Sequence, residues 1–319
     1  MSIRQTGNYF PIIILGIVCD NAPDNRNLWK TLGISFEDTE NIISSFPHPI
    51  TNQNVWIFAD FPHLIKLLRN NLIDNGFTLQ NGEKLNSSHL RQLIQLDKAE
   101  LKICHKLTEK HLTCKNQERM RVAKAFELFS HTNAVAMKTF LPHKSNVANF
   151  IELINDSSDI LNSRFPNSNA NIYKTPYGQH YEKQTAKLKE LYEAIRFLKI
   201  GKRKKLYPFQ KGFLLTINST IKLWSEMREN YPQFKFLLTA RLNQDHLENF
   251  FSLIRGFGGF NQNPSPTETI TRIKAIALSQ NLKHSEYLSV KDEDFGTGTN
   301  SFNTFLLNID SETENVQGT

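Results

Sequence analysis

The sequence predicts an α/β protein whose sheet-forming part is interrupted by a long block of helices. Two short β-branched strands near the start of the chain each end in an aspartate. From about residue 64 to residue 200, apolar residues recur at helical spacing with little sign of strands. A helix that carries two carboxylates follows only after this block. This order predicts two parts of one domain that are separated in sequence and adjacent in space.

The first predicted strand is the apolar run over residues 12–19, which a polar turn ends abruptly at Asp20. A continuous β-branched run is typical of a strand buried on both faces. Asp20 is therefore expected at the carboxyl end of a strand, where the ligand sites of α/β sheets tend to lie. A helix over residues 25–32, closed by Gly33, should follow.

The second predicted strand covers residues 55–59 and again ends in an acid, Asp60. Pro62 then opens a helix, since proline suits the first turn. Leucine and isoleucine at helical spacing give this helix an inward face, and the same spacing predicts that Lys66 and Arg69 point outward.

The interrupting block is predicted to be helical throughout. Expected helices cover residues 88–101, 118–137 and 145–162, followed by a loop rich in Asn, Ser and Pro over 165–178 and a polar helix over 181–199. The basic cluster 202–205 and Pro208 mark the exit from the block.

After the exit, the pattern returns to mixed structure. We expect a helix over 212–230, a strand over 234–238, a helix from about residue 242, a loop over 256–266 and a last helix to about 282. Residues 286–319 are polar and show little periodicity, which predicts a disordered tail.

The helix expected from residue 242 places Asp245 and Glu248 one turn apart, opposite an apolar stripe of Leu247, Phe250, Phe251 and Ile254. Carboxylates at this spacing repel each other unless a cation lies nearby. One interpretation is a solvated acidic edge answered by Arg241 and Arg255. The other is a divalent-metal site, because Mg²⁺ is often held by one or two carboxylates together with substrate phosphates.

Composition limits the functional classes. The net charge of +7 is partly clustered, notably at residues 202–205, and favours an anionic partner such as nucleic acid or a phosphate ligand, although many basic proteins bind neither. The three cysteines lack the CxxC spacing of a zinc finger and favour a reducing compartment, the cytosol or nucleus. The run before Asp20 is too short to cross a membrane, and no cleavable signal precedes it, so we expect neither membrane insertion nor secretion.

Four ordered strings carry a resemblance to a known family: IVCDNAPDNRNLWKTLGI, FADFPHLIKLLRNNLIDNG, ERMRVAKAFELFSHTNA and LTARLNQDHLENFFSLIRGFGGFNQNP. Together they resemble the P-element family of transposases, including its THAP-domain-containing relatives. The resemblance implies a partial RNase H-like domain of the DDE/D type, interrupted by an all-helical GTP-binding insertion domain. The implied boundaries are 1–63 and 201–285 for the RNase H-like parts, 64–200 for the insertion and 286–319 for the tail.

The resemblance also implies roles for the acids. Asp20 resembles the second catalytic aspartate and Glu248 the final catalytic glutamate, both as Mg²⁺ ligands, with Asp245 as a supporting acid. In such a site, one metal activates the attacking water or 3′-hydroxyl and another stabilises the leaving oxygen. Asp60, Pro62, His63 and Lys66 match the signature at the entrance to the insertion, although a histidine after a proline is more often a packed or capping residue.

For the nucleotide, Asp159 and Asn162 resemble the guanine-contacting segment of the family. Lys106, Val122 and Ser130 lie in regions that could line the same site. The sequence has no GxxxxGK[ST] loop, so GTP is implied by the resemblance alone.

Two family features are missing from the sequence. Residues 1–19 contain no acid that could be the first catalytic aspartate, and no zinc module of the THAP type is present. We therefore expect a transposase fragment lacking its amino-terminal part. Its family chemistry is Mg²⁺-dependent cleavage and strand transfer at transposon ends in the nucleus, with GTP as cofactor, DNA as partner and a homo-oligomer as the assembly.

Two other hypotheses remain open at this stage. The chain could be a domesticated, non-catalytic GTP-linked module for DNA binding or oligomerisation, for which the absent first aspartate is the supporting feature. It could also be an unrelated helical protein with an accidental acid pair, in which case Asp20 and Glu248 should lie far apart.

Overall fold

The computed structural model describes residues 13–98, 102–166, 171–259 and 261–287, with the backbone alone for 280–287. The described residues up to Asn249 form one compact unit, and the described residues from Phe250 to Tyr287 form a second. The predicted mixture of a small sheet and a long helical block is confirmed.

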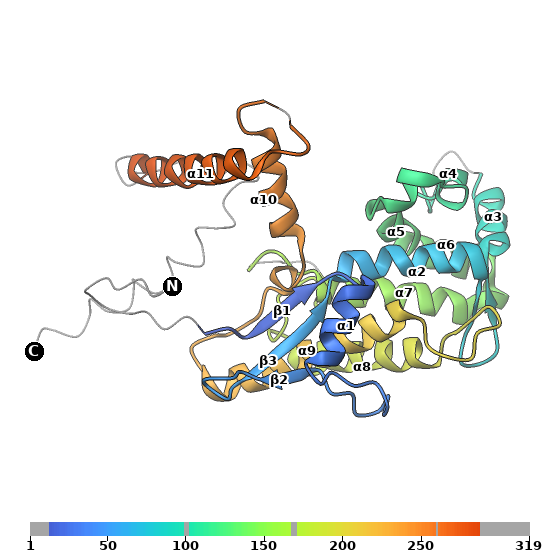
Figure 1. Cartoon of the computed structure of the whole chain (residues 1–319). Helices are drawn as coiled ribbons and strands as arrows, with labels where there is room; N and C mark the ends of the chain where they lie inside the picture. Colours follow the sequence, from blue (N-terminus) through green and yellow to red (C-terminus); the bar gives the residue numbers. More distant parts are fainter. Residues whose placement is uncertain (1–12, 99–101, 167–170, 260, 288–319) are drawn as a thin grey trace, which may run out of the picture. The chain divides into compact units, whose positions relative to one another are not determined.

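The first unit contains a three-stranded sheet in the order β1-β3-β2 (Figure 1). Strand β1 (Gly16–Cys19) pairs in parallel with β3 (Asn54–Ala59), so that Cys19 lies opposite Ala59. Strand β3 follows the sequence prediction. The first strand is shorter than the predicted run over 12–19 and is not fully buried: it starts at Gly16, Ile13 and Ile14 before it are exposed, and residue 12 lies outside the described residues. The antiparallel edge strand β2 (Ser45–Pro47) escaped prediction because three residues ending in a proline carry no periodic signal.

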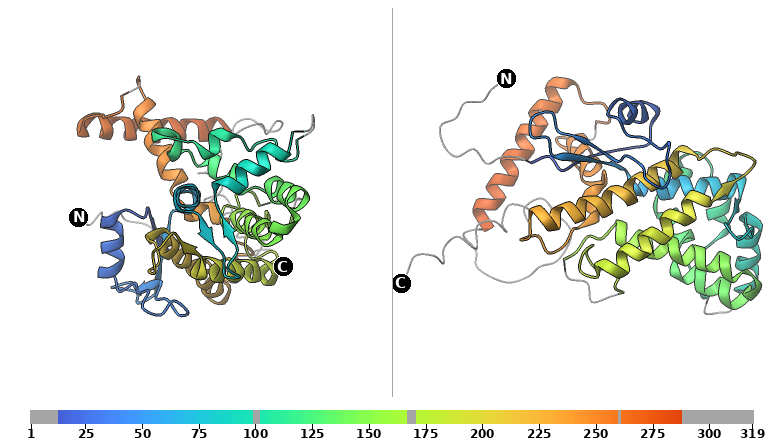
Figure 2. Two further views of the ribbon diagram at one scale, coloured as in Figure 1. Left: turned by 90° about the vertical axis from the view of Figure 1, so that its right-hand side faces the viewer. Right: turned by 90° about the horizontal axis from the view of Figure 1, so that it is seen from below.

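Helix α1 (Pro23–Thr31) follows β1 and is anchored to it, because the indole N–H of Trp29 donates to the Cys19 sulfur at 3.0 Å. Helix α9 (Pro208–Asn230) runs along β3, as Figure 2 shows from below. The Thr216 hydroxyl on α9 accepts from the backbone N–H of Ala59 at 3.0 Å and donates to its carbonyl at 2.9 Å. These bonds fix α9 where β3 ends, beside the two strand-end acids.

The helical block packs as a series of neighbouring pairs: α6 against α7, α7 against α8, and α8 against α9 (Figures 1 and 2). Its helices are α2 (Phe61–Asn75), α3 (Ser87–Leu96), α4 (Glu109–Leu112), α5 (Ala123–Leu128), α6 (His131–Phe140), α7 (Ser145–Leu161) and α8 (Tyr181–Phe197), with 3-10 turns η1 (Asn116–Met120) and η2 (Pro142–Lys144).

The block differs from the sequence prediction in several places. The helix expected over 88–101 ends at Leu96, and residues 99–101 lie outside the described part. The prediction of a single helix over 118–137 is wrong, because the helix is interrupted at Ser130. The Asn133 amide donates to the carbonyls of Glu127 and Leu128 at 2.8 and 2.9 Å. A side chain that satisfies these carbonyls stabilises a helix end there. The block also contains a small sheet of two-residue strands, β4 (Phe77–Thr78), β5 (Lys84–Leu85) and β6 (Lys199–Ile200), too short to be predicted.

The strand expected over 234–238 is wrong. Only Leu237 pairs, through a single β-bridge to Tyr177, because its partner is a loop and not a sheet. A 3-10 turn, η3 (Thr239–Leu242), then precedes α10 (Asp245–Gly256), so that this helix begins later than predicted.

In the second unit, α11 (Pro266–Tyr287) is longer than predicted, and residues 288–319 of the expected tail lie outside the described part. The apolar stripe on α10 is not a buried face. Leu247 and Phe251 are 48% and 46% exposed, and Ile254 is buried. Arg272 of α11 donates to the carbonyls of Ile254 and Arg255, so α11 covers only the end of the stripe. Among the described residues, no helix is long and apolar enough to cross a membrane.

Gly178, in the turn before α8, should be among the least replaceable glycines. Its φ is +107°, and a Cβ there would lie 2.4 Å from the buried indole of Trp224. We expect Gly178→Ala to lower the free energy of unfolding by about 2–4 kcal/mol, from backbone strain and overpacking together.

Gly82 is the matched control, because its φ is +85° and a Cβ would meet nothing within 4 Å. Gly82→Ala should lower the free energy of unfolding by about 1 kcal/mol, through backbone strain alone. Urea denaturation of both variants checks the difference, and equal losses would contradict the packing argument.

Candidate functional site

The two strand-end acids lie at the same edge of the sheet. Asp20 and Asp60 directly follow β1 and β3, which run in parallel, and the Asp60 backbone N–H donates to the Cys19 carbonyl at 2.9 Å. The prediction that Asp20 ends a strand is confirmed. Its Oδ1 accepts from the Ala22 backbone N–H at 3.0 Å and from the Asn25 amide at 2.5 Å, so the turn that starts α1 fixes this carboxylate.

Asp60 connects this sheet edge to the start of α10. One carboxylate oxygen accepts from the His63 backbone N–H at 3.2 Å, which caps α2. The other accepts from the Gln244 backbone N–H at 2.9 Å, immediately before α10. Asp60 is only 6% exposed, and burial raises the pKa of its carboxyl. A single buried side chain thus ties the sheet edge to the segment just before α10, almost two hundred residues later in the chain.

Lys66 lies among the acids. The prediction that Lys66 and Arg69 point outward is wrong: they are 6% and 0% exposed, because α9 and η1 cover this side of α2. Burial lowers the pKa of the Lys66 amine, and the negative charges of Asp60, Glu248 and Asp20 oppose that shift. Three carboxylates from three segments therefore act on one buried ammonium group.

His63 lies next to the same charges and is half-buried. Burial, followed by the Lys66 charge, lowers the pKa of its imidazole, while Asp60 and Asp20 act in the opposite direction. Its backbone serves the cap of α2, in line with a packed or capping residue.

Asp245 has a different environment from Glu248. Its carboxylate forms an ion pair with Arg164, which follows the end of α7, and its backbone N–H is capped by the Asn243 side chain at 3.1 Å. Arg164 was not identified from the sequence, because a pair between residues so distant in sequence has no local signal. Asp245 therefore joins α10 to the helical block.

The described residues offer few closely grouped side chains that could hold a metal ion. Across residues 13–98, 102–166, 171–259 and 261–287, no three His, Cys, Asp or Glu side chains are grouped closely enough to hold a metal ion. The carboxylates of Asp20 and Glu248 both act on the charge of the Lys66 amine, and their oxygens are hard ligands. Mg²⁺ commonly takes one or two protein carboxylates. The donor chemistry fits Mg²⁺, with further ligands expected from substrate.

The helical block contains a cavity of about 330 Å³, within the size range of small-ligand sites. Four of the five residues proposed for the nucleotide line it: Lys106, Ser130, Asp159 and Asn162. Val122, the fifth, caps the start of α5 and is not part of the lining. The remaining lining residues, not identified from the sequence, are Phe126, Glu127, Phe129, Asn155 and Ser158.

Asp159 is the chemically distinctive residue of this cavity. Its Oδ2 is buried without a hydrogen-bond partner, and burial raises the pKa of the carboxyl to about 6, with Lys174 opposing and Asp156 adding to the shift. An unpaired buried acceptor is costly unless a ligand donates to it. Asn155 and Asn162 share its face of α7 at spacings of four and three residues, a pattern that could have identified Asn155 from the sequence.

The cavity is connected directly to α10. The Asn162 side-chain oxygen, on the cavity lining, accepts from the Asn243 amide at 3.3 Å. One residue further on, the backbone N–H of Ser163 donates to the Thr239 hydroxyl at 3.0 Å, and the Thr239 N–H donates back to the Ser163 hydroxyl at 3.2 Å. The end of α7 and the segment leading into Glu248 are therefore held together by buried hydrogen bonds.

Comparisons with known proteins agree with this arrangement. Residues 62–176 match the family described as TNP-like, GTP-binding insertion domain, and residues 241–268 match the one described as TNP-like, RNase H C-terminal domain. The chain is 34% identical over 280 residues to the transposable element P transposase of Drosophila melanogaster, a match covering 85% of this chain and 36% of that protein. It is 30% identical over 264 residues to the DNA transposase THAP9 of Homo sapiens, covering 76% of this chain and 28% of that protein.

A solved structure is also similar. The Drosophila P element transposase strand transfer complex matches with a TM-score of 0.77 and 32% identity, covering 84% of this chain and 61% of that chain. The chain spans only 36% and 28% of the lengths of the two curated relatives. Both matched regions, the fold and the relatives lead to one conclusion: this chain belongs to the P-element-like transposase family, with an RNase H-like fold interrupted by a GTP-binding insertion domain.

Proposed function

We propose that this chain forms the GTP-binding and strand-cleaving core of a DNA transposase that acts in the nucleus as a homo-oligomer on transposon ends and target DNA. The observation that carries the GTP assignment is the unpartnered Asp159 carboxylate in the α7 cavity. Guanine presents two N–H donors side by side, whereas adenine presents only one amino group on that edge. An ionised carboxylate at the cavity wall suits guanine better than adenine.

The candidate cleavage site is the sheet edge at Asp20. Asp20 and Glu248 would hold Mg²⁺, which when bound would activate the attacking hydroxyl and stabilise the leaving oxygen. Lys66 keeps the carboxylates together through its buried positive charge, and Asp60 holds the start of α10 in place. Asp245 supports this site through its ion pair with Arg164, which follows the helix that lines the GTP cavity.

The alternative proposal is a non-catalytic GTP-linked module for DNA binding or oligomerisation. The observation behind it is that no three His, Cys, Asp or Glu side chains are grouped closely enough to hold a metal ion in the described regions. We expect the chain alone to bind DNA without cutting it.

Two assays test the proposal. Calorimetric titration should show GTP binding with a clear preference over ATP, and equal or undetectable binding would remove the GTP assignment. Incubation with Mg²⁺ and transposon-end DNA should give binding without cleavage. Cleavage that Glu248→Ala abolishes would instead show that the chain is catalytically complete and reject the alternative.

A further inference from the structure

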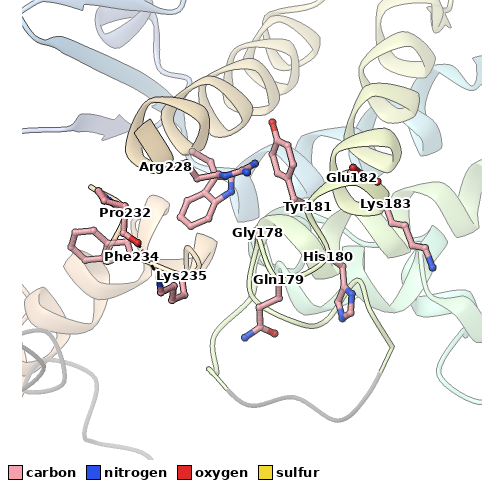
Figure 3. A pocket seen from close by; sticks show the side chains of 11 residues that line it. Gly178, Gln179, His180, Tyr181, Glu182, Lys183, Arg228, Pro232, Phe234 and Lys235 are labelled. Carbon is pink, nitrogen blue, oxygen red and sulfur yellow. Dashed lines mark hydrogen bonds between the residues drawn. The ribbon is translucent and has the colours of Figure 1, made fainter. Parts of the chain in front are cut away.

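A second cavity, of about 670 Å³, lies between the start of α8 and the end of α9 (Figure 3). It shares no lining residue with the GTP cavity, and none of the candidate cleavage residues contributes to it. Pro232, Phe234 and Lys235 form one wall, and Gly178, Gln179 and His180 form the other, as Figure 3 shows.

The charges around this cavity favour an anion. Lys183, Arg228 and Lys235 contribute permanent positive charges, and Glu182 is the single carboxylate in the lining. Within the described part of the chain, no ion pair is formed by any of these three cations. The Arg228 guanidinium instead lies over the Tyr181 ring, 4.8 Å from its centroid, which holds it flat and leaves its N–H edges for a ligand.

The cavity also has an aromatic component. Phe234 lines the cavity and is 44% exposed, so part of its ring is open to a stacking partner. Trp224 packs edge-on against Tyr177 and is 2% exposed, yet its indole N–H has no hydrogen-bond partner. A buried donor without a partner is costly, and Trp224 is one of the residues that line the cavity.

We propose that this cavity binds one unpaired nucleotide of a DNA strand. Cationic side chains beside an exposed aromatic ring are the arrangement by which proteins bind single strands, with phosphates at the cations and a base stacked on the ring. Arg228 and Lys235 take the phosphate, and Phe234 takes the base. A base inside a duplex is already stacked on both faces and cannot enter, so the site selects unpaired DNA. The inference rests on the proposed action on DNA. It adds the place on the protein where an unpaired nucleotide of the strand is held.

The test is fluorescence anisotropy on the full chain, using an oligo-dT strand of about twelve nucleotides, a duplex of the same length, and free dTMP as competitor. Phe234→Ala should weaken binding of the strand about tenfold and leave duplex binding unchanged. Arg228→Gln should reduce the slope of log affinity against log salt by about 0.7, the contribution of one phosphate contact. The matched controls, Phe197→Ala and Lys189→Gln, change an exposed aromatic and an exposed cation outside the cavity and should have no effect.

The outcomes are distinguishable. Strand affinities within twofold of the unchanged chain for both cavity variants would overturn the inference. If dTMP displaced the strand at equal concentration, free nucleotide would be the ligand and the assignment to a DNA strand would be wrong. If no DNA bound while GTP still bound, the proposed action on DNA would fail as well. GTP affinity also confirms that each variant is folded.

Discussion

Replacing Asp159 by asparagine should abolish the preference of this chain for GTP over ATP. The carboxylate has one buried oxygen without a partner, positioned to accept from guanine, and asparagine would present an N–H donor or a weaker, neutral acceptor. Hydrogen bonds to a charged group contribute about 1.5–3 kcal/mol each, so we expect GTP affinity to fall by about a hundredfold or more. ATP affinity should change little. Calorimetric titration of both nucleotides measures the ratio directly.

The same carboxyl predicts a pH dependence. Burial raises its pKa to about 6 in the unliganded protein, so the ionised form that accepts from guanine is lost as pH falls through 6. GTP affinity should therefore decrease between pH 7 and pH 5, and Asp159→Asn should lose this dependence. The raised pKa has the opposite sign for stability: its contribution is fully present below the unfolded pKa of about 3.9 and is lost as pH rises through about 6.

Asp156→Asn is the matched control for this experiment. Asp156 lies on the same helix, and burial also raises the pKa of its carboxyl, but it does not line the cavity. Its replacement should leave the GTP to ATP ratio at neutral pH unchanged. The fall in GTP affinity should remain and move slightly toward lower pH, because the Asp156 charge contributes to the raised pKa of Asp159. A pH profile that persists in Asp159→Asn would contradict the assignment of the guanine contact to Asp159.

Replacing Asp60 by alanine should both destabilise the protein and release the start of α10. The change removes the cap of α2, leaves the Gln244 backbone N–H without its acceptor, and takes one negative charge from the buried Lys66 amine. A lost cap costs about 0.5–2 kcal/mol and an unsatisfied buried donor about 1–3 kcal/mol, so we expect a loss of about 2–4 kcal/mol in the free energy of unfolding. Chemical denaturation measures the loss.

Hydrogen exchange separates positioning from general stability. The Gln244 amide should exchange far faster in Asp60→Ala than the loss of global stability explains, because its only described acceptor is removed. Asp60→Asn, which keeps one acceptor oxygen, should be intermediate. Asp38→Ala is the control, since Asp38 is exposed and its bonds are local. Unchanged protection of Gln244 in Asp60→Ala would show that Asp60 does not hold α10 in place.

The elements that the sequence predicted well are those whose signal is local. A β-branched run that stops at an acid fixed the expectation for Asp20, and a strand followed by Asp60 and a proline predicted the start of α2. The face of α7 that carries Asp159 and Asn162 also has a simple helical period. In each case the residues that determine the element are neighbours along the chain.

The features that the sequence missed depend on distant segments. Lys66 was expected to face solvent, because nothing in α2 itself shows that α9 would cover its polar side or that three acids would surround the amine. Arg164 was not identified as the partner of Asp245 for the same reason. The break at Ser130 depends on one side chain, Asn133, turning back to the preceding carbonyls, which helical periodicity does not show. Tertiary contacts decided the first two, and a local side-chain contact decided the third.

The central claim is that a strand-end aspartate and a glutamate from beyond the helical block form one cation site. A crystal structure of the chain with Mn²⁺ in place of Mg²⁺ tests it most directly, because the anomalous signal locates the metal. We expect a peak that contacts both Asp20 and Glu248. A peak elsewhere, or carboxylates more than about 12 Å apart when metal centres of this kind span about 4 Å, would contradict it.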